Sequence, residues 1–271
     1  MLSLQRVTYR YAGARGPSLQ DVSLELGAGE VVGVVGASEA GKTTLCLVAS
    51  GLAPRAVSGT LTGHLLLDGE DAGPLPMHRL AERIGIAFAN PATQLSGVAS
   101  TVYEEIAFGP MNLGLPRAEV VARTDAALDT LGISGLTERD PSRLSGGQQQ
   151  LVAIGGLLAM RPAHLILDEP TAQLDPAGTR LVADALARVA AGGASILLTE
   201  HKTDLLAAIC TRVVCLEAGR VVLAGDAASV LSDDRLIDLG VAPPAAVRLV
   251  RSARSAGLPD TAVDRLVGGL R

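Results

Sequence analysis

Residues 36–43 constrain the fold of this chain more than any other segment. They read Gly-Ala-Ser-Glu-Ala-Gly-Lys-Thr and fit the phosphate-loop pattern G-x-x-x-x-G-K-[ST]. A solid apolar run at residues 30–35 precedes them, and a helical stretch from about residue 42 to residue 50 follows. In this strand–loop–helix context, backbone N–H groups of the loop and the helix N-terminus point inward and bind phosphate oxygens. The pattern therefore predicts a nucleotide-binding loop rather than an ordinary glycine-rich turn.

The cations of the chain support this interpretation. The sequence contains 21 arginines but only two lysines, Lys42 and Lys202. Where arginine is the default cation, a lysine inside a glycine-rich loop indicates a specific role for that lysine. Lys42 is expected to reach the β- and γ-phosphates of a nucleotide, and the Thr43 hydroxyl is expected to ligate magnesium.

A second motif lies at residues 164–170, where the apolar stretch His-Leu-Ile-Leu ends in Asp168, Glu169 and Pro170. The carboxyl edge of a parallel sheet is where ligands bind in α/β folds. Asp168 is expected to hold magnesium through its water shell, and Glu169 to polarise the attacking water as a general base. Alone this motif is weak, because strands often end in solvated charges, but its place downstream of a phosphate loop makes it informative.

The order of apolar segments predicts an α/β fold. Residues 2–9 and 22–26 alternate like half-buried strands, which suggests an N-terminal antiparallel patch. Residues 30–35, 64–67, 84–88, 164–167 and 195–199 look like further strands, and residues 101–131 and 146–160 look helical, with a break at residues 114–116. Strands that alternate with helices indicate a mainly parallel sheet flanked by helices. We expect one domain at residues 1–232, with a helical subdomain at about 95–160, and a C-terminal extension at 233–271.

The composition of the chain argues against several classes of protein. Hydrophobic residues make up 48% and charged residues 19%, as in folded globular proteins. The net charge of −5 gives no electrostatic case for nucleic acid. No apolar run approaches the roughly 18–20 residues that cross a bilayer, and the N-terminus has no signal-peptide pattern. The three cysteines, Cys46, Cys210 and Cys215, lie in apolar contexts that predict reduced, buried thiols. We therefore expect a cytosolic chain that a partner can recruit to a membrane.

A third motif, Leu-Ser-Gly-Gly-Gln at residues 144–148, lies between the other two. With it, residues 2–230 resemble the ATP-binding-cassette (ABC) ATPases, of which this pentapeptide is the signature. The resemblance implies that Tyr11 stacks on adenine, that His201 contacts the γ-phosphate, and that Leu174 and Asp175 belong to the loop after the acidic motif. The residues implied to bind ATP are Tyr11, Gly36, Ala37, Ser38, Glu39, Ala40, Gly41, Lys42, Thr43 and Thr44.

The resemblance also implies a mechanism and a fold, that of a phosphate-loop NTPase of the ABC type. Two such domains face each other head to tail, and each ATP lies between one phosphate loop and the partner's signature. The signature residues Ser145, Gly146, Gly147 and Gln148 would then act on the nucleotide of the other subunit. A helix that starts after Ser145 would offer the positive end of its dipole to the γ-phosphate. The implied cofactors are ATP and Mg²⁺, and the implied catalytic residues are Glu169 and His201.

Looser motifs are similar to those of energy-coupling-factor (ECF) transporters, which take up vitamins or nickel or cobalt ions. They are Phe-Ala-Asn-Pro-Ala-Thr-Gln at residues 88–94, Glu-Pro-Thr-Ala-Gln-Leu-Asp-Pro at 169–176 and Leu-Gly-Val-Ala-Pro at 239–243. The similarity implies three partners: a second ABC ATPase, identical or a sister chain, a transmembrane coupling subunit and a small substrate-binding membrane protein. It places the chain at the cytoplasmic face of the membrane, bound peripherally.

Three positions depart from the family pattern. Ala89 stands where glutamine is usual, Glu39 where glycine is common, and Leu151 where arginine is frequent. Gln94 is expected to be the second glutamine of the ECF pattern rather than a substitute for the first. Ala89 and Glu39 keep open a low-turnover regulatory subunit in a heterodimer, whereas Glu169 and His201 favour hydrolysis. A soluble ABC ATPase without a transport role is the other alternative.

Overall fold

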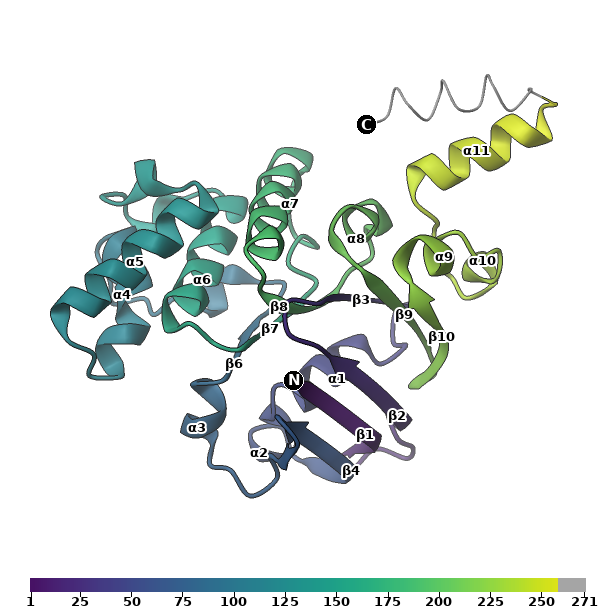
Figure 1. Cartoon of the computed structure of the whole chain (residues 1–271), viewed down its shortest axis with the longest axis horizontal. Helices are drawn as coiled ribbons and strands as arrows, with labels where there is room; N and C mark the ends of the chain where they lie inside the picture. The colour runs from purple at the N-terminus through teal and green to yellow at the C-terminus, as the bar shows by residue number, and fades with distance from the viewer. Residues whose placement is uncertain (258–271) are drawn as a thin grey trace.

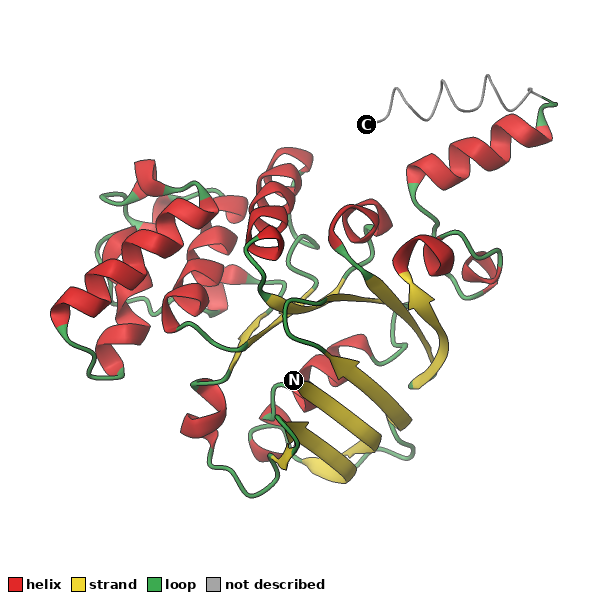
Figure 2. Cartoon of the chain, in the orientation of Figure 1, coloured by secondary structure: helices red, strands yellow, loops and turns green. Residues whose placement is uncertain are grey.

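In the computed structural model of the protein, which describes residues 1–257, two β-sheets are surrounded by helices (Figures 1 and 2). The smaller sheet is antiparallel, with strand order β2-β1-β4-β5. Its strands are β1 (Leu2–Tyr11), β2 (Leu19–Leu26), β4 (Gly59–Leu67) and β5 (Glu70–Asp71). Buried apolar residues of β1 and β2 alternate with polar ones, apart from the register shifts along β1, as in an antiparallel sheet that packs one face on a core. This confirms the predicted antiparallel patch.

The larger sheet contains β3, which precedes the phosphate loop, and β7, which ends in the acidic motif. Its order is β10-β9-β3-β8-β7-β6, and every pair is parallel except the β9–β10 hairpin. The strands are β3 (Val31–Val35), β6 (Ile84–Ala87), β7 (His164–Asp168), β8 (Ser195–Thr199), β9 (Arg212–Glu217) and β10 (Arg220–Asp226). Every residue of β3, β7 and β8 is buried, as the continuous apolar runs predict for strands covered on both faces.

Alternate residues of the central strands point to opposite faces of the sheet and pack into two different hydrophobic cores. Val32 and Val34 of β3 pack with helix α1 (Lys42–Ala49) and the antiparallel sheet. Val31 and Val35 pack on the opposite face, with helices α4 (Val102–Asn112), α5 (Arg117–Leu131), α6 (Gly146–Met160), α7 (Pro176–Ala191) and α8 (Thr203–Ile209). In Figure 1, α6, α7 and α8 lie on that face, and the antiparallel sheet lies on the other. Two further short helices, α2 (Leu52–Arg55) and α3 (Met77–Ala81), lie on the same side as the antiparallel sheet.

The helical region before and after the signature motif has the predicted break. Helix α4 (Val102–Asn112) ends before Gly114, and α5 (Arg117–Leu131) starts directly after Pro116. Helix α6 (Gly146–Met160) has the predicted bounds, and α7 (Pro176–Ala191) begins at its expected proline. Helix α8 (Thr203–Ile209) follows β8.

The chain after β10 remains attached to the main body. It forms α9 (Ala227–Leu231), α10 (Arg235–Asp238) and the more remote α11 (Ala245–Ser255), as Figure 1 shows. Leu236 and Val241 are buried in the larger core, so residues near the start of the expected extension are anchored there. The rest of that extension, residues 258–271, lies outside the described residues, and the domain division stays a prediction. Within residues 1–257, no helix is both long and apolar enough to span a bilayer.

Candidate functional site

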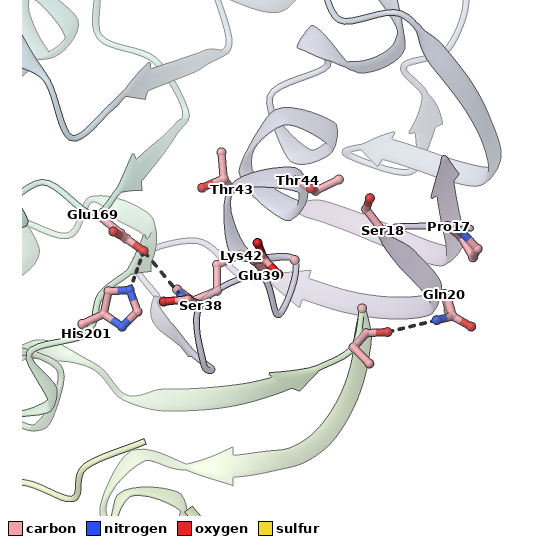
Figure 3. Close-up of a pocket in the computed structure, with 13 residues that line it drawn as sticks. Pro17, Ser18, Gln20, Ser38, Glu39, Lys42, Thr43, Thr44, Glu169 and His201 are labelled. Atoms are coloured by element: carbon pink, nitrogen blue, oxygen red, sulfur yellow. Dashed lines mark hydrogen bonds and ion pairs between the residues drawn. The ribbon is translucent and has the colours of Figure 1, made fainter. Parts of the chain in front are cut away.

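The phosphate loop connects the end of β3 to the first residue of α1, so its backbone folds over the helix N-terminus (Figure 3). Gly41 has a φ of 106°, and a Cβ there would lie 2.7 Å from the Ser18 carbonyl oxygen. Only glycine fits such a conformation and such an approach. Glu39 also has a left-handed backbone, with φ 65°, at a position that glycine would occupy more easily.

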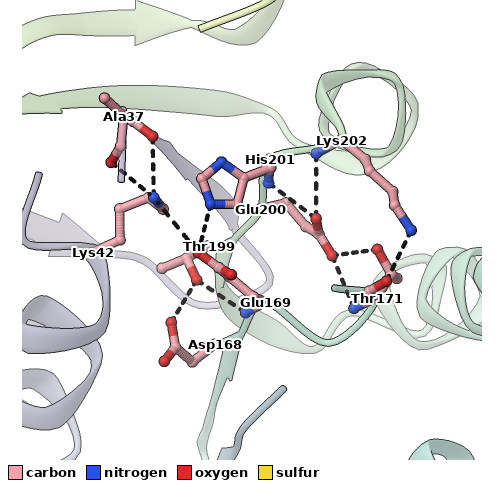
Figure 4. Close-up of polar contacts among 10 residues, drawn as sticks. Ala37, Lys42, Asp168, Glu169, Thr171, Thr199, Glu200, His201 and Lys202 are labelled. Atoms are coloured by element: carbon pink, nitrogen blue, oxygen red, sulfur yellow. Dashed lines mark hydrogen bonds and ion pairs between the residues drawn. The ribbon is translucent and has the colours of Figure 1, made fainter. Parts of the chain in front are cut away.

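Lys42 begins α1, and its ammonium group lies inside the loop. The side chain is 5% exposed, and Nζ donates to the carbonyl oxygens of Gly36 at 3.0 Å and Ala37 at 3.1 Å. Glu169 Oε1 lies 3.5 Å from the same nitrogen (Figure 4). A buried ammonium requires such acceptors, and a bound phosphate oxygen could take their place.

The acidic motif emerges from the end of β7, next to β8. The Thr199 hydroxyl donates to Asp168 Oδ1 at 2.7 Å and accepts from the Glu169 backbone N–H at 3.0 Å. Burial raises the pKa of the Asp168 carboxyl, and hydrogen bonds from Thr199 and Thr43 partly offset that rise. Thr43 and Asp168 therefore bring a hydroxyl and a carboxylate together, which are oxygen ligands of the kind that Mg²⁺ prefers.

His201 meets Glu169 from the loop after β8. Its Nε2 lies 3.0 Å from Glu169 Oε1, and its side chain is 49% exposed. One carboxylate oxygen thus stands between the imidazole of His201 and the ammonium of Lys42, as Figures 3 and 4 show. Three residues predicted from separate motifs converge here, because β3, β7 and β8 are neighbours and end at the same edge of the sheet.

These groups face a cleft of about 590 Å³, within the range of about 300–1,000 Å³ typical of ligand pockets. Of the predicted ATP-binding residues, Ser38, Glu39, Gly41, Lys42, Thr43 and Thr44 line it, together with Glu169 and His201. Gly36, Ala37 and Ala40 are not among the residues that line it. Five lining residues were not anticipated: Pro17, Ser18, Gln20, Ala218 and Gly219.

The unanticipated residues come from two turns that approach the loop closely. The Gly219 N–H donates to the Ala40 carbonyl at 3.0 Å, and the Gln20 N–H donates to the Gly219 carbonyl at 2.8 Å. Ala218 and Gly219 both have positive φ and form the turn of the β9–β10 hairpin. An Ala-Gly pair between two apolar runs was a weak signal for that hairpin.

Tyr11 lies beside the cleft but does not line it. Its hydroxyl is 2.9 Å from Thr44 Oγ1, and its ring packs edge-on against Tyr9 with centroids 5.0 Å apart. The Thr44 hydroxyl thus connects Tyr11 to the cleft wall. Its role in stacking on adenine stays a prediction.

The signature motif forms the start of α6, and none of its residues lines the cleft. Ser145 and Gln148 form a reciprocal capping box, in which the Ser145 N–H donates to Gln148 Oε1 at 3.1 Å. Ser145 and Gly146 are exposed, whereas Gly147 packs against Gly178 of α7. The N-terminus of α6 is therefore open to another molecule, away from the phosphate loop of its own chain.

The positions that depart from the family pattern have distinct surroundings. Gln94 Oε1 accepts from the Phe88 N–H at 3.0 Å, and its Nε2 donates to the Phe88 carbonyl at 3.1 Å, so this glutamine braces its own loop. Half-buried Ala89 offers no polar side chain. Glu39 is exposed at the cleft, and Leu151 is buried in the larger core.

Comparisons with known proteins agree on one family. A model of the ABC transporter family matches residues 19–172. The chain is 40% identical over 262 residues to the cobalt import ATP-binding protein CbiO of Rhodobacter capsulatus, covering 94% of this chain and 90% of that protein. It is 36% identical over 260 residues to the energy-coupling factor transporter ATP-binding protein EcfA of Methanosarcina acetivorans, covering 95% and 91%.

A solved structure and a longer relative complete the comparison. The structure of cbiO1 from Clostridium perfringens, part of the ABC transporter complex cbiONQ, superposes with a TM-score of 0.76 at 32% identity, covering 88% of this chain and 92% of that one. Another protein of Methanosarcina acetivorans, assigned to the ABC transporters, is 40% identical over 251 residues. The match covers 92% of this chain and 41% of that protein, so the chain spans about two fifths of its length.

Proposed function

The chain belongs to the ABC transporter family of ATP-binding proteins, and we propose that it hydrolyses ATP to power a membrane transporter. The observation that carries this proposal is the contact of Glu169 with both Lys42 and His201 beside the phosphate loop. A subunit that only binds nucleotide has no need of a carboxylate held between these two groups. We therefore favour hydrolysis over the regulatory alternative.

Each group at the cleft has a role that its surroundings support. Lys42 binds the β- and γ-phosphates, helped by the backbone N–H groups at the start of α1. Glu169 takes the proton of the attacking water, and His201 contacts the γ-phosphate from the far side of the carboxylate. Thr43 and Asp168 would hold Mg²⁺, which would neutralise charge on the phosphates.

A complete site requires a second ABC subunit, either identical or a sister chain. Ser145 and Gly146, at the start of α6, are exposed and lie outside the cleft of their own chain, so the signature motif acts on the nucleotide of the partner. The positive end of the helix dipole there suits a γ-phosphate. An isolated monomer binds ATP and hydrolyses it poorly.

The transport role is of the ECF type, with a vitamin or a transition-metal ion as the cargo of another polypeptide. The motifs at residues 88–94 and 239–243, and the identity of 40% to the cobalt import protein of Rhodobacter capsulatus, support this branch. The chain works at the cytoplasmic face of the membrane, where a transmembrane coupling subunit and a small substrate-binding membrane protein recruit it.

The test is co-purification of a tagged Glu169→Gln chain from its native host, with membranes solubilised in the presence of Mg-ATP. We expect mass spectrometry to identify a transmembrane subunit, a small membrane protein and either one or two ATPase chains. A tagged Lys42→Ala chain, which lacks the phosphate contact, is the matched control for recovery that depends on ATP. Recovery of the soluble chain without membrane proteins would contradict the transport role.

A further inference from the structure

We propose that Glu200 and Lys202, the two neighbours of His201 in sequence, are positioning residues that hold His201 against Glu169. Both grip Thr171, which follows Glu169 by two residues (Figure 4). We call Thr171, Glu200 and Lys202 the Thr171 clip. The inference rests on the proposed function, because it concerns the geometry of the same hydrolytic site.

Glu200 supplies one half of the clip. Its side chain is 1% exposed, and its Oε1 accepts from both the backbone N–H of Thr171, at 2.9 Å, and the Thr171 hydroxyl, at 2.5 Å. Its Oε2 accepts from the backbone N–H groups of His201 at 3.0 Å and Lys202 at 3.3 Å. Four donors thus converge on one buried carboxylate, which ties the loop after β7 to the loop after β8.

Lys202 supplies the other half. Its Nζ donates to the Thr171 carbonyl oxygen at 2.8 Å and to the Thr179 hydroxyl, in the first turn of α7, at 2.7 Å. The N–H, C=O and O–H groups of Thr171 are therefore all bound by the residues on either side of His201. This contact gives a role to the second of the two lysines in the chain.

The clip matters because His201 has little support of its own. Its side chain is 49% exposed on a loop, and the position of its Nε2 relative to Glu169 depends on how the two loops are held together. A site residue works only when the groups around it fix its geometry, and a misplacement of 1 Å can cost about 100-fold in rate. The buried carboxylate of Glu200 fixes the backbone of His201 directly.

The experiment measures ATP hydrolysis by the assembled transporter complex with Glu200→Gln or Thr179→Val in this chain. Glu200→Gln replaces one acceptor oxygen by an amide donor, and Thr179→Val removes an acceptor of Lys202 while it keeps the shape of the side chain. We expect kcat to fall about 10- to 100-fold with Glu200→Gln, and less with Thr179→Val, while KM for ATP stays within about two-fold. Thr179→Ser, which keeps the hydroxyl, should retain the wild-type rate.

A double-mutant cycle with His201→Ala separates positioning from general stability. If the clip acts through His201, Glu200→Gln and Thr179→Val should lower kcat little further once the imidazole is absent. Equal losses in both backgrounds, or no loss in the wild-type background, would overturn the inference while leaving the hydrolytic function intact. If Glu200→Gln fails to fold, the milder Thr179→Val and Thr179→Ser pair decides the question. A wild-type complex that does not hydrolyse ATP would instead refute the proposed function, and the inference with it.

Discussion

The contact between α6 and α7 leads to a quantitative prediction about Gly147 of the signature motif. A Cβ added at Gly147 would lie 2.8 Å from the Cα of Gly178, closer than the 3.0 Å that real Cβ atoms essentially never breach. The neighbour is backbone in the first turn of α7, so it cannot rotate away as a side chain could. Gly147→Ala should therefore push the two helices apart.

The expected cost follows from overpacking. Forcing one extra carbon into a well-packed contact costs about 1–3 kcal/mol. Alanine returns about 0.5–1 kcal/mol of this through helix propensity, and for a chain of this size about 1 kcal/mol corresponds to a change of about 2–4 °C in Tm, so Gly147→Ala should lower Tm by up to about 10 °C. Gly156 is the matched control, because it lies in the same helix and a Cβ there has no neighbour within 4 Å. Gly156→Ala should gain about 0.5–1 kcal/mol from helix propensity.

Thermal denaturation of the purified chain without nucleotide measures both variants against the wild type. We expect the two alanines to shift Tm in opposite directions. A Gly147→Ala variant as stable as the wild type, or more so, would refute the claim that the close approach of α6 and α7 requires glycine.

Three further predictions concern buried or strained groups. Because burial raises the pKa of Asp168, the native state binds its proton more tightly than the unfolded chain, and stability falls as pH rises from about 3.9 through the folded pKa. Asp168→Asn should thus raise Tm of the nucleotide-free protein at pH 7 and flatten this pH dependence, and a lower Tm would contradict the explanation. Glu39→Gly should stabilise the protein by about 0.5–1 kcal/mol in urea denaturation. The reason is that glycine adopts the left-handed backbone without strain, and this gain exceeds the cost of the greater conformational entropy of glycine in the unfolded chain. An unchanged midpoint would argue against strain at Glu39. Burial raises the pKa of Cys210 to about 12 and that of Cys215 to about 11, and Cys46 is buried. A thiol reagent at about pH 8 should therefore react slowly with the native protein, whereas all three thiols should react after unfolding.

The sequence predicted those parts of the site that depend on local pattern. The phosphate loop, the strand that ends at Asp168 and the start of α6 after Ser145 are each contained within about ten residues. The break between α4 and α5 was likewise visible in Gly114 and Pro116. Lys42, Glu169 and His201 could be brought together only through the expected parallel sheet and the resemblance to a family.

Contacts between segments that lie far apart in the sequence could not be predicted. The β9–β10 hairpin was not among the expected strands, although it brings Gly219 against the phosphate loop. Thr171 and Glu200 are 29 residues apart, and neither belongs to a motif that foretells their contact. Burial of Leu236 also shows that a change in composition near residue 233 does not mark the end of packing against the core.

Hydrolysis at this chain's own site is tested by the steady-state rate of Mg-ATP hydrolysis by the transporter complex, measured with the wild-type chain and with Glu169→Gln. The substitution keeps the size of the side chain and removes the carboxylate that contacts Lys42 and His201. Loss of a general base predicts a rate about 10²- to 10⁴-fold lower, with ATP still bound. An unchanged rate would contradict the claim that this chain hydrolyses ATP at its own site.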